Sequence, residues 1–395
     1  MPGLIPERHQ GFTRWQPKVA VPTPGAGRLG VLLLGALLAL PAAGADRVIL
    51  RGEAPSPHER YCAWFGASDA SQETLYFGEA AFWTAYRSQG RDPRADLRAT
   101  GPQRIGRVDL AGERLLPPLE VTWPGARSGV WDVLPHPNGR VYFTTFFEAS
   151  GWVDPATGAH ARFDAIGVGL SELALASGGQ LVAARYAQPG QRHGSLVRFS
   201  PDGFLLSEWR MSGPEAVRVA PKSVAYDPVR HETWGLTDLL PEHGDGVIGH
   251  DARVYDRFGR ERLRFARPEI QFVTFGPDGT GYLAEVEGAA LHLRILAPGD
   301  AEAPLERGRR ILLDAGFPAG FDFVQDLTLA PDGRVVATRW SGFVHVVDAA
   351  GGATTLRLPR LDDEGLYYTG VLREDRVCAT YCSEPTVVCQ DAKAP

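Results

Sequence analysis

Three carboxylate side chains occupy the same place in a unit that repeats along this 395-residue chain. Asp132, Glu172 and Asp326 each stand seven residues before a tight turn that contains glycine. If the units repeat around a ring, these carboxylates converge near its axis, where they repel unless a proton, a basic partner or a cation compensates them. Oxygen ligands favour Ca²⁺ or Mg²⁺. We therefore predict a metal site at these three residues. The alternative is that each accepts backbone hydrogen bonds or pairs with a basic side chain.

A second set of side chains follows the turn of each unit by six residues and alternates in charge. Arg185 and Arg339 in this set can neutralise the inner carboxylates, or can clamp an anionic ligand through bidentate guanidinium contacts. An aromatic residue follows each arginine and suits the wall of a small-molecule site. With a histidine from a nearby loop, the predicted ligand-binding residues are Glu79, Arg185, Tyr186, Asp238, His243, Glu285, Arg339 and Trp340.

Two insertions interrupt the units, an arginine-rich one at Ala80–Gly106 in the first unit and a glycine-rich one at Leu239–Asp251 in the fourth. Two histidines, His243 and His250, lie seven residues apart in the second insertion. Imidazole groups can ligate a metal or act as acid and base, although exposed loop histidines usually do neither. Ser171 and Ser223 lack the nearby histidine and aspartate that a hydrolase triad needs. The histidines are therefore the candidates for proton transfer, and the serines are not.

The elements that position these residues are expected to be short strands. Each unit is an apolar segment, a tight polar turn and a second apolar segment, most clearly in Val133–Phe143, Val273–Leu283 and Leu327–Ala337. The Asn-Gly and Asp-Gly pairs in these turns tolerate the positive φ that tight hairpins demand. A second hairpin usually follows. Repetition about every 40–50 residues, with four strands per unit, is typical of a β-propeller.

The turns of the units number seven and lie near Glu73, Gly139, Gly179, Glu232, Gly279, Gly333 and Asp375. The last unit has three strands before the sequence ends, and we expect Asp46–Leu50 to supply the fourth. Closure by strands from both ends removes an open sheet edge. The predicted fold is all-β, a seven-bladed β-propeller closed by an N-terminal strand, in a single domain of residues 46–395. A six-bladed ring with the first unit as a cap is the alternative.

All four cysteines follow the first 61 residues, and an even number in an exported chain indicates two disulfides. Cys62 begins the inner strand of the first unit and Cys382 ends the second strand of the last, so both are expected on one rim. We predict Cys62–Cys382 across the closure and Cys378–Cys389 within the last unit.

Residues 1–45 have the pattern of a secretory signal peptide with a long n-region. The apolar run Gly30–Leu40 follows Arg28, and Ala43 and Ala45 stand at the cleavage positions. An uncleaved anchor is the alternative. We expect an exported protein, periplasmic or extracellular, without a membrane span in the mature chain. The net charge of −6 gives no basic footprint for nucleic acid.

The repeats also resemble those of known propellers. Val141–Thr144 followed by Gly151–Gly158 resembles the repeat of streptogramin-lyase-like propellers. The Pro-Asp-Gly copies resemble NHL repeats and the wider group of SMP-30/gluconolactonase proteins. The resemblance covers most of residues 60–390 as architecture. It implies a propeller whose enzymes use a divalent metal, or a His/Glu pair, at the central axis.

Two classes of function remain open from the sequence. One is an exported monomer that binds a small molecule, or a protein or glycan partner, at the axial face. The other is a metal-dependent hydrolase, lactonase or lyase of the SMP-30 type, with Ca²⁺ or Mg²⁺ as cofactor.

Overall fold

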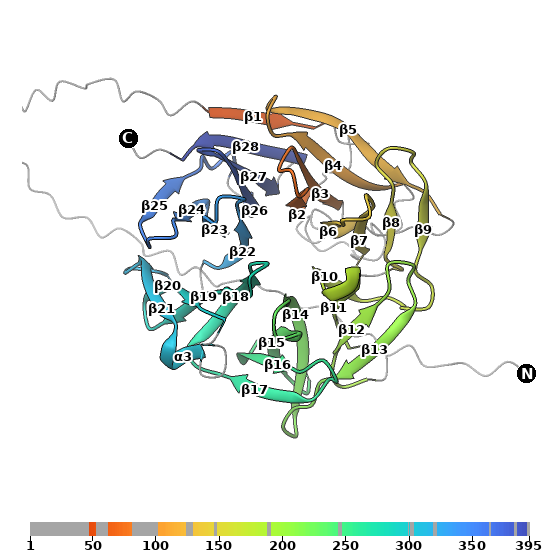
Figure 1. Cartoon of the computed structure of the whole chain (residues 1–395), viewed down its shortest axis with the longest axis vertical. Helices are drawn as coiled ribbons and strands as arrows, with labels where there is room; N and C mark the ends of the chain where they lie inside the picture. Colours follow the sequence, from red (N-terminus) through yellow and green to blue (C-terminus); the bar gives the residue numbers. More distant parts are fainter. Residues whose placement is uncertain are drawn as a thin grey trace, which may run out of the picture.

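The computed structural model describes residues 47–52, 62–80, 102–123, 129–145, 148–187, 191–243, 247–298, 300, 304–318, 322–362, 365–382 and 385–392. Within them the chain forms seven four-stranded antiparallel sheets around a central axis (Figure 1). The predicted seven-bladed propeller is confirmed, and the six-bladed alternative is wrong. The predicted signal peptide lies outside the described residues. No helix among the described residues is long and apolar enough to cross a membrane.

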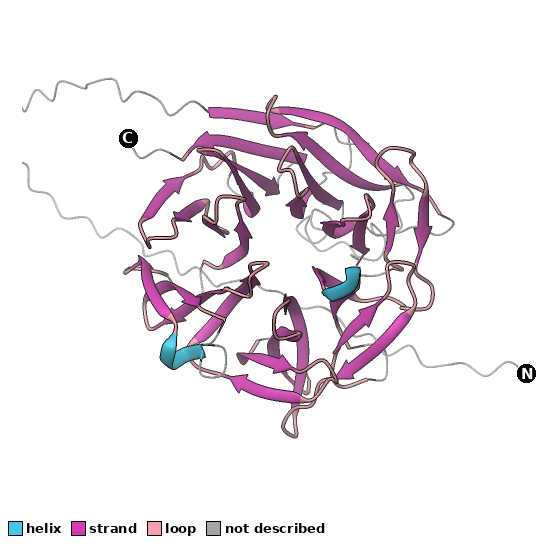
Figure 2. Ribbon diagram, in the orientation of Figure 1, coloured by secondary structure: helices cyan, strands magenta, loops and turns pink. Residues whose placement is uncertain are grey.

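Six of the blades are made of four consecutive strands, ordered from the axis outward (Figure 2). In blades 1 to 3 the strands are β2 (Cys62–Ser68), β3 (Thr74–Ala80), β4 (Gln103–Asp109) and β5 (Arg114–Val121); β6 (Val130–Pro135), β7 (Val141–Thr145), β8 (Gly151–Val153) and β9 (His160–Arg162); and β10 (Leu170–Leu175), β11 (Leu181–Arg185), β12 (Ser195–Phe199) and β13 (Leu205–Arg210). In blades 4 to 6 they are β14 (Val217–Asp227), β15 (Glu232–Pro241), β16 (Gly249–Tyr255) and β17 (Glu261–Phe265); β18 (Glu269–Phe275), β19 (Gly281–Glu287), β20 (Ala290–Leu296) and β21 (Arg309–Asp314); and β22 (Val324–Leu329), β23 (Val335–Arg339), β24 (Phe343–Val347) and β25 (Ala353–Arg357).

The seventh blade joins the two ends of the chain. Its strands, from the axis outward, are β26 (Leu366–Arg373), β27 (Arg376–Cys382), β28 (Pro385–Asp391) and β1 (Arg47–Arg51). Strand β1 pairs antiparallel with β28, with Arg47 opposite Gln390 and Arg51 opposite Thr386. The predicted closure by the N-terminal strand is therefore confirmed.

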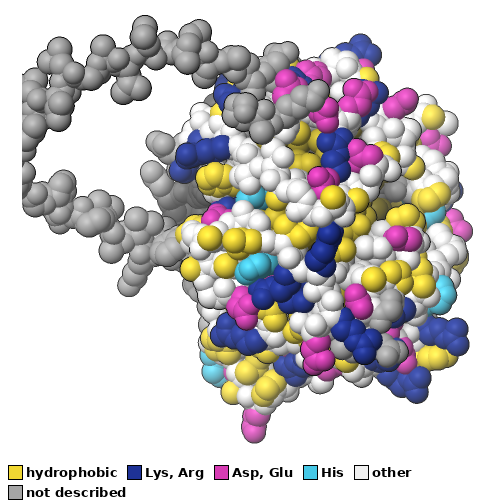
Figure 3. All heavy atoms as spheres, turned by 60° about the vertical axis from the view of Figure 1, so that its left-hand side comes forward, with side chains coloured by type: hydrophobic (Ala, Val, Ile, Leu, Met, Phe, Trp, Pro, Cys, Tyr) yellow, Lys and Arg dark blue, Asp and Glu magenta, His cyan; other side chains and the backbone are white. Residues whose placement is uncertain are grey.

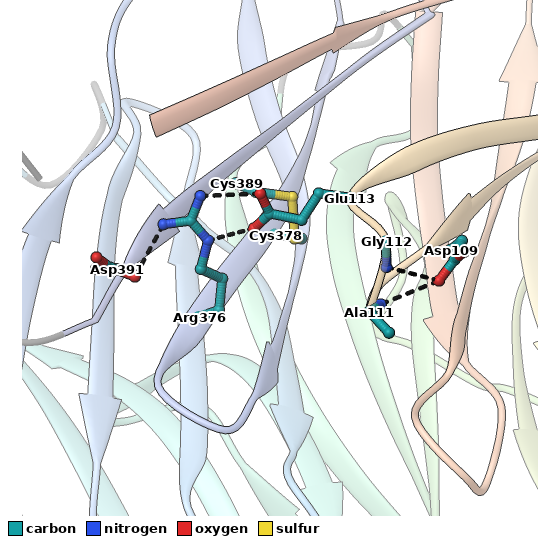
Figure 4. The surroundings of a disulfide bond; sticks show 8 residues. All are labelled: Asp109, Ala111, Gly112, Glu113, Arg376, Cys378, Cys389 and Asp391. Carbon is teal, nitrogen blue, oxygen red and sulfur yellow. Dashed lines mark hydrogen bonds and ion pairs between the residues drawn. A yellow bond between two sulfur atoms is a disulfide. The ribbon is translucent and has the colours of Figure 1, made fainter. Parts of the chain in front are cut away.

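Both predicted disulfides are present in the structure. Cys62–Cys382 links β2 of blade 1 to β27 of blade 7, and Cys378–Cys389 joins directly opposed residues of β27 and β28. Figure 4 shows the second disulfide beside Arg376, whose guanidinium lies between Glu113 of blade 1 and Asp391 of blade 7. Backbone pairing, a covalent bond and an ion pair thus hold the ring closed together.

The turns behave as their sequences predict. In every blade, the turn between the two inner strands includes a residue with positive φ: Gln72, Gly139, Gly178, His231, Gly279, Gly333 and Glu374. At Gly139 and Gly279 φ is 86° and 82°, a region that glycine enters without a Cβ clash. The blade 3 turn is a short 3₁₀ segment, Ser177–Gly179. The four-residue helix α3 (Pro304–Arg307) precedes β21.

The apolar core lies between neighbouring blades, in layers. One such layer packs Val182 and Ala184 of β11 against Val219 and Val224 of β14. Successive side chains along each strand point to opposite faces of the blade, so each blade can pack against the blades on both of its sides. On the surface, basic and acidic side chains are interspersed over the face that Figure 3 brings forward.

The two expected insertions have different outcomes. The insertion predicted at Leu239–Asp251 is strand at both of its ends, because β15 continues to Pro241 and β16 begins at Gly249. This extended pairing places Asp238 directly opposite His250. Most of the arginine-rich insertion predicted in the first unit, residues 81–101, lies outside the described residues.

Candidate functional site

The innermost strand of every blade carries a register shift, near the start of the strand in six blades and in the middle of the longer β14 in blade 4. A β-bulge adds an unpaired residue, bends the strand and changes the direction of a side chain. We call the residues within these shifts the axial bulge ring. They are Trp64 and Phe65, Trp131, Ser171 and Glu172, Lys222, Gln271, Gln325, and Tyr368 and Thr369.

One half of the ring is aromatic and comes from blades 7, 1 and 2. The centroid of Trp64 lies 4.4 Å from that of Trp131 and 4.8 Å from that of Tyr368. Phe65 contacts Tyr368 edge-on, with centroids 5.2 Å apart. Trp64, Phe65 and Tyr368 are buried, whereas Trp131 is half-buried. This packed group is an aromatic wall with one partly accessible member.

The other half of the ring is polar and comes from blades 3 to 6. Glu172, Lys222 and Gln325 are half-buried, and Gln271 is buried. The Gln271 Oε1 atom accepts a hydrogen bond from the backbone N–H of Val324 at 2.8 Å. The ring therefore has an apolar half and a half with charged and amide groups.

The three carboxylates predicted as a metal site all have pKa values raised by burial. The pKa of Asp132 is raised to about 7, chiefly by burial and to a smaller extent by the charge of Asp326, against the lowering effect of two backbone hydrogen bonds. Burial, followed by the charge of Asp132, raises the pKa of Glu172 well above its ordinary value, and Asp326 adds to the shift. Burial also raises the pKa of Asp326 to about 7. The charge of Asp326 in blade 6 thus acts on the carboxyl groups of Asp132 in blade 2 and Glu172 in blade 3, as expected for side chains that face a common axis.

The geometry of these carboxylates does not fit a resident cation. Among the described residues, no group of three or more His, Cys, Asp or Glu side chains lies close enough to hold a metal ion. Both oxygens of Asp132 accept backbone N–H groups instead, from Val133 and Leu173, each at 2.8 Å. Backbone hydrogen bonding was the alternative in the sequence. We assign no chemical step to Ca²⁺ or Mg²⁺, and the metal site stays a prediction.

A chain of charged side chains extends outward from the ring through blades 4 and 5. Lys222 Nζ lies 3.5 Å from Asp238 Oδ1, which is also 2.9 Å from His250 Nδ1. His250 Nε2 lies 3.6 Å from Glu269 Oε1. Burial alone would raise the pKa of Asp238, but Lys222 and His250 hold it below its ordinary value. His250 is thus held between two carboxylates, an arrangement suited to proton transfer.

Tyr186 belongs to the same neighbourhood. Burial raises the pKa of its phenol, and the charges of Asp238 and Glu172 raise it further. Of the predicted ligand-binding residues, the structure therefore brings Tyr186 and Asp238 to the axial bulge ring.

Four other predicted ligand-binding residues lie in ion pairs, within their own blades or, for Arg339 of blade 6, also with Asp314 of blade 5. Glu79 pairs with Arg104 at 3.3 Å, and burial raises the pKa of Glu79 to about 7. The sequence suggested that Arg185 could neutralise the axial carboxylates. In the structure its guanidinium pairs with Glu208 instead.

The other two form the most extensive of these pairs. Both oxygens of Glu285 accept from Arg294 at 2.9 Å, and Arg310 adds a contact at 2.6 Å. Arg339 lies 2.6 Å from both Asp314 and Asp322. The placement of these four residues supports a role in blade stability, not in ligand binding.

The last two predicted residues lie on loops. His243 is exposed, directly before residues that the structure does not describe. Trp340 is half-buried at the end of β23, with its ring centroid 5.6 Å from that of Phe323.

Sequence reasoning missed Trp131, Lys222 and Gln325. The alignment of the units at the seventh residue before each turn assumed that the inner strands are regular. Because each inner strand contains a bulge, residues other than the seventh also lie on the axial bulge ring. Trp131 and Gln325 stand eight residues before their glycine turns, so the same alignment read one position earlier would have found them.

No protein-family model matches the chain, and no curated protein matches it. Two solved structures of virginiamycin B lyase from Staphylococcus aureus are similar, one a catalytically inactive histidine-to-alanine variant with quinupristin and one a selenomethionine-substituted form. Each matches with a TM-score of 0.58 at 10% sequence identity, over 88% of this chain and 99% of the other. The fold is a streptogramin-lyase-like β-propeller. At this identity the likeness concerns the fold alone, which confirms the architecture that the repeats predicted.

Proposed function

We propose that this protein binds a small amphipathic molecule at the axial bulge ring. The observation that carries the proposal is the division of the ring into an aromatic wall around Trp131 and a polar wall around Glu172 and Lys222. Small-molecule sites are lined largely by apolar and aromatic groups, with a few polar groups that fix orientation. The two walls supply both components at one place.

The burial of the ring favours a small ligand over a protein or glycan partner. The ring residues are buried or half-buried, and they converge from seven strands toward one axis. A macromolecular partner needs an exposed surface of about 800 Å² on each side. Among the described residues, the axial bulge ring offers half-buried groups that a small molecule can contact. It does not offer an exposed surface of that area.

The two disulfides support an exported protein. Disulfides persist in oxidising compartments and are rare in reducing ones. A periplasmic or extracellular location would give the ring access to molecules outside the cell.

A binding experiment with paired tryptophan variants tests the proposal. Trp131→Ala removes the accessible part of the aromatic wall, whereas Trp152→Ala removes a tryptophan of the same blade that lies under Arg140, on β8. We expect calorimetric titration with 3-phenylpropanoate and related aromatic compounds to show binding that Trp131→Ala weakens at least about tenfold and Trp152→Ala leaves unchanged. Binding that is insensitive to Trp131, or no binding of any aromatic compound, would contradict the proposal.

A second candidate function is hydrolysis or elimination on the bound molecule. The specific observation in its favour is His250, which lies between Asp238 and Glu269 and can move a proton to or from a ligand. One of the similar solved structures is a lyase whose histidine-to-alanine variant is inactive, which is consistent with this candidate. Once a bound compound is known, turnover that His250→Gln abolishes while binding persists would favour the enzyme. Absence of turnover in the unmodified protein would favour binding alone.

A further inference from the structure

Lysine is rare in this chain. It occurs at Lys18, Lys222 and Lys393, and arginine supplies all the other basic residues among the 41. Lys18 and Lys393 lie outside the described residues, so Lys222 is the one lysine in the part that the structure describes. In the buried ion pairs Arg294–Glu285 and Arg339–Asp322 the cation is arginine.

Lys222 lies on the axial bulge ring. It is the extra residue in the register shift of β14, between Pro221 and Ser223. Its side chain is 30% exposed, its ammonium lies 3.5 Å from Asp238 of its own blade, and its charge acts on Glu172 of blade 3. The one lysine of the described chain is therefore directed to the site by a local distortion of its strand.

The positive charge of Lys222 is only partly compensated. Asp238 Oδ1 lies 3.5 Å from the ammonium and is closer to His250 Nδ1, at 2.9 Å. Glu172 is close enough for the two charges to interact, but burial raises its pKa well above the ordinary value, which favours its protonated form. An ammonium has three N–H donors. One ion pair with Asp238 leaves donors for a ligand.

The other acidic groups at the axis are already hydrogen-bonded within the protein. Both oxygens of Asp132 accept backbone N–H groups, and Asp326 is bonded to Thr369 and to the backbone of Leu327. Burial favours the protonated form of both carboxyls. In their protonated forms, Asp132 and Asp326 carry no negative charge and do not repel an approaching anion.

We propose that Lys222 anchors a carboxylate group of the small molecule, whose apolar or aromatic body contacts the Trp131 side of the ring. The ligand class is thus an aromatic or apolar carboxylate, and Lys222 determines the selection of anions over neutral and cationic analogues. This inference rests on the proposed function. Lysine suits the place because its ammonium is a compact charge on a flexible stem, whereas arginine presents a wider planar fork.

The test uses three probes with one aromatic body and different head groups: 3-phenylpropanoate, 3-phenylpropanamide and 3-phenylpropylamine. Calorimetric titration of the unmodified protein should show the carboxylate binding most tightly. Lys222→Met should weaken the carboxylate at least about tenfold, because a hydrogen bond to a charged group is lost, and should change the amide little. Lys222→Arg should recover only part of the loss.

The controls separate failure of this inference from failure of the proposed function. Arg262→Met removes a half-exposed cation on the outermost strand of the same blade, paired with Glu232, and should not alter binding of the carboxylate. If the amine binds best, or if Lys222→Met leaves carboxylate affinity unchanged while Trp131→Ala abolishes it, the inference is wrong and the binding site stands. If no probe binds with dependence on Trp131, the proposed function fails with it. Circular dichroism of each variant checks folding, and Lys222→Gln replaces Lys222→Met if the latter does not fold.

Discussion

The axial carboxylates had two interpretations in the sequence, as ligands of a metal ion or as acceptors of backbone hydrogen bonds. Their equivalent positions predicted convergence at the axis, and the charge of Asp326 raises the pKa of both Asp132 and Glu172. The sequence could not show that the backbone N–H groups of Val133 and Leu173 would satisfy Asp132. Those bonds depend on the bulge and on the neighbouring blade, which are features of tertiary structure.

Asp326 should make stability depend on pH. Its pKa rises from an ordinary 3.8 to about 7 on folding because of burial, so the folded state binds the proton more tightly. This stabilisation is complete below about pH 4 and is lost as the pH rises through about 7. We expect Asp326→Asn to reduce the fall in the urea unfolding midpoint between about pH 5 and pH 8. An unchanged pH profile would show that Asp326 is ionised in the folded protein.

Glu285 and Glu287 offer a matched pair on strand β19. The Glu285 side chain is fully buried against Arg294, whereas that of Glu287 is 62% exposed against Arg310. Glu285→Ala leaves a buried cation unpaired, and we expect it to lower the free energy of unfolding by about 3–5 kcal/mol. Glu287→Ala should cost less than about 1 kcal/mol. Equal effects in urea titrations would argue against a structural role for Glu285.

At the scale of elements, the hairpins followed from the sequence and the bulges did not. Turn residues such as Gly139 and Gly279 identify a hairpin locally, because their positive φ is a local requirement. A bulge depends on how an inner strand packs against the next blade. For that reason Lys222 and Trp131, which occupy bulges, were not found, whereas both disulfides could be inferred from the order of the strands.

The two disulfides should contribute unequally to stability. Cys62–Cys382 spans 320 residues and Cys378–Cys389 spans 11, so the first restricts the unfolded chain far more. We expect the Cys62→Ala/Cys382→Ala variant to lose about 2–5 kcal/mol of unfolding free energy, and more than the Cys378→Ala/Cys389→Ala variant. Denaturant unfolding under identical conditions measures both. A larger loss for the shorter loop would contradict the entropic explanation.

At the scale of the whole molecule, the last blade of the propeller is completed by strand β1 from the N-terminal end of the chain. All five residues of strand β1, from Arg47 to Arg51, pair with the outer edge of β28. Deleting residues 1–51 should expose that edge, lower the thermal unfolding midpoint and promote self-association, as open edges do. Light scattering and thermal unfolding measure these effects. A chain lacking only residues 1–46 keeps β1 and should behave as the full protein does. Equal behaviour of the two deletions would show that closure does not need β1.

The central claim is that the axial bulge ring is a binding site for a small amphipathic molecule. The most direct test is ¹⁹F NMR of the protein labelled with 5-fluorotryptophan and titrated with 3-phenylpropanoate, with the Trp131 signal assigned through Trp131→Phe. We predict that the signals of Trp64 and Trp131 shift with saturation while those of Trp152 and Trp209, on outer strands, stay fixed. Shifts confined to the outer tryptophans, or no shift at Trp131 at any probe concentration, would contradict the claim.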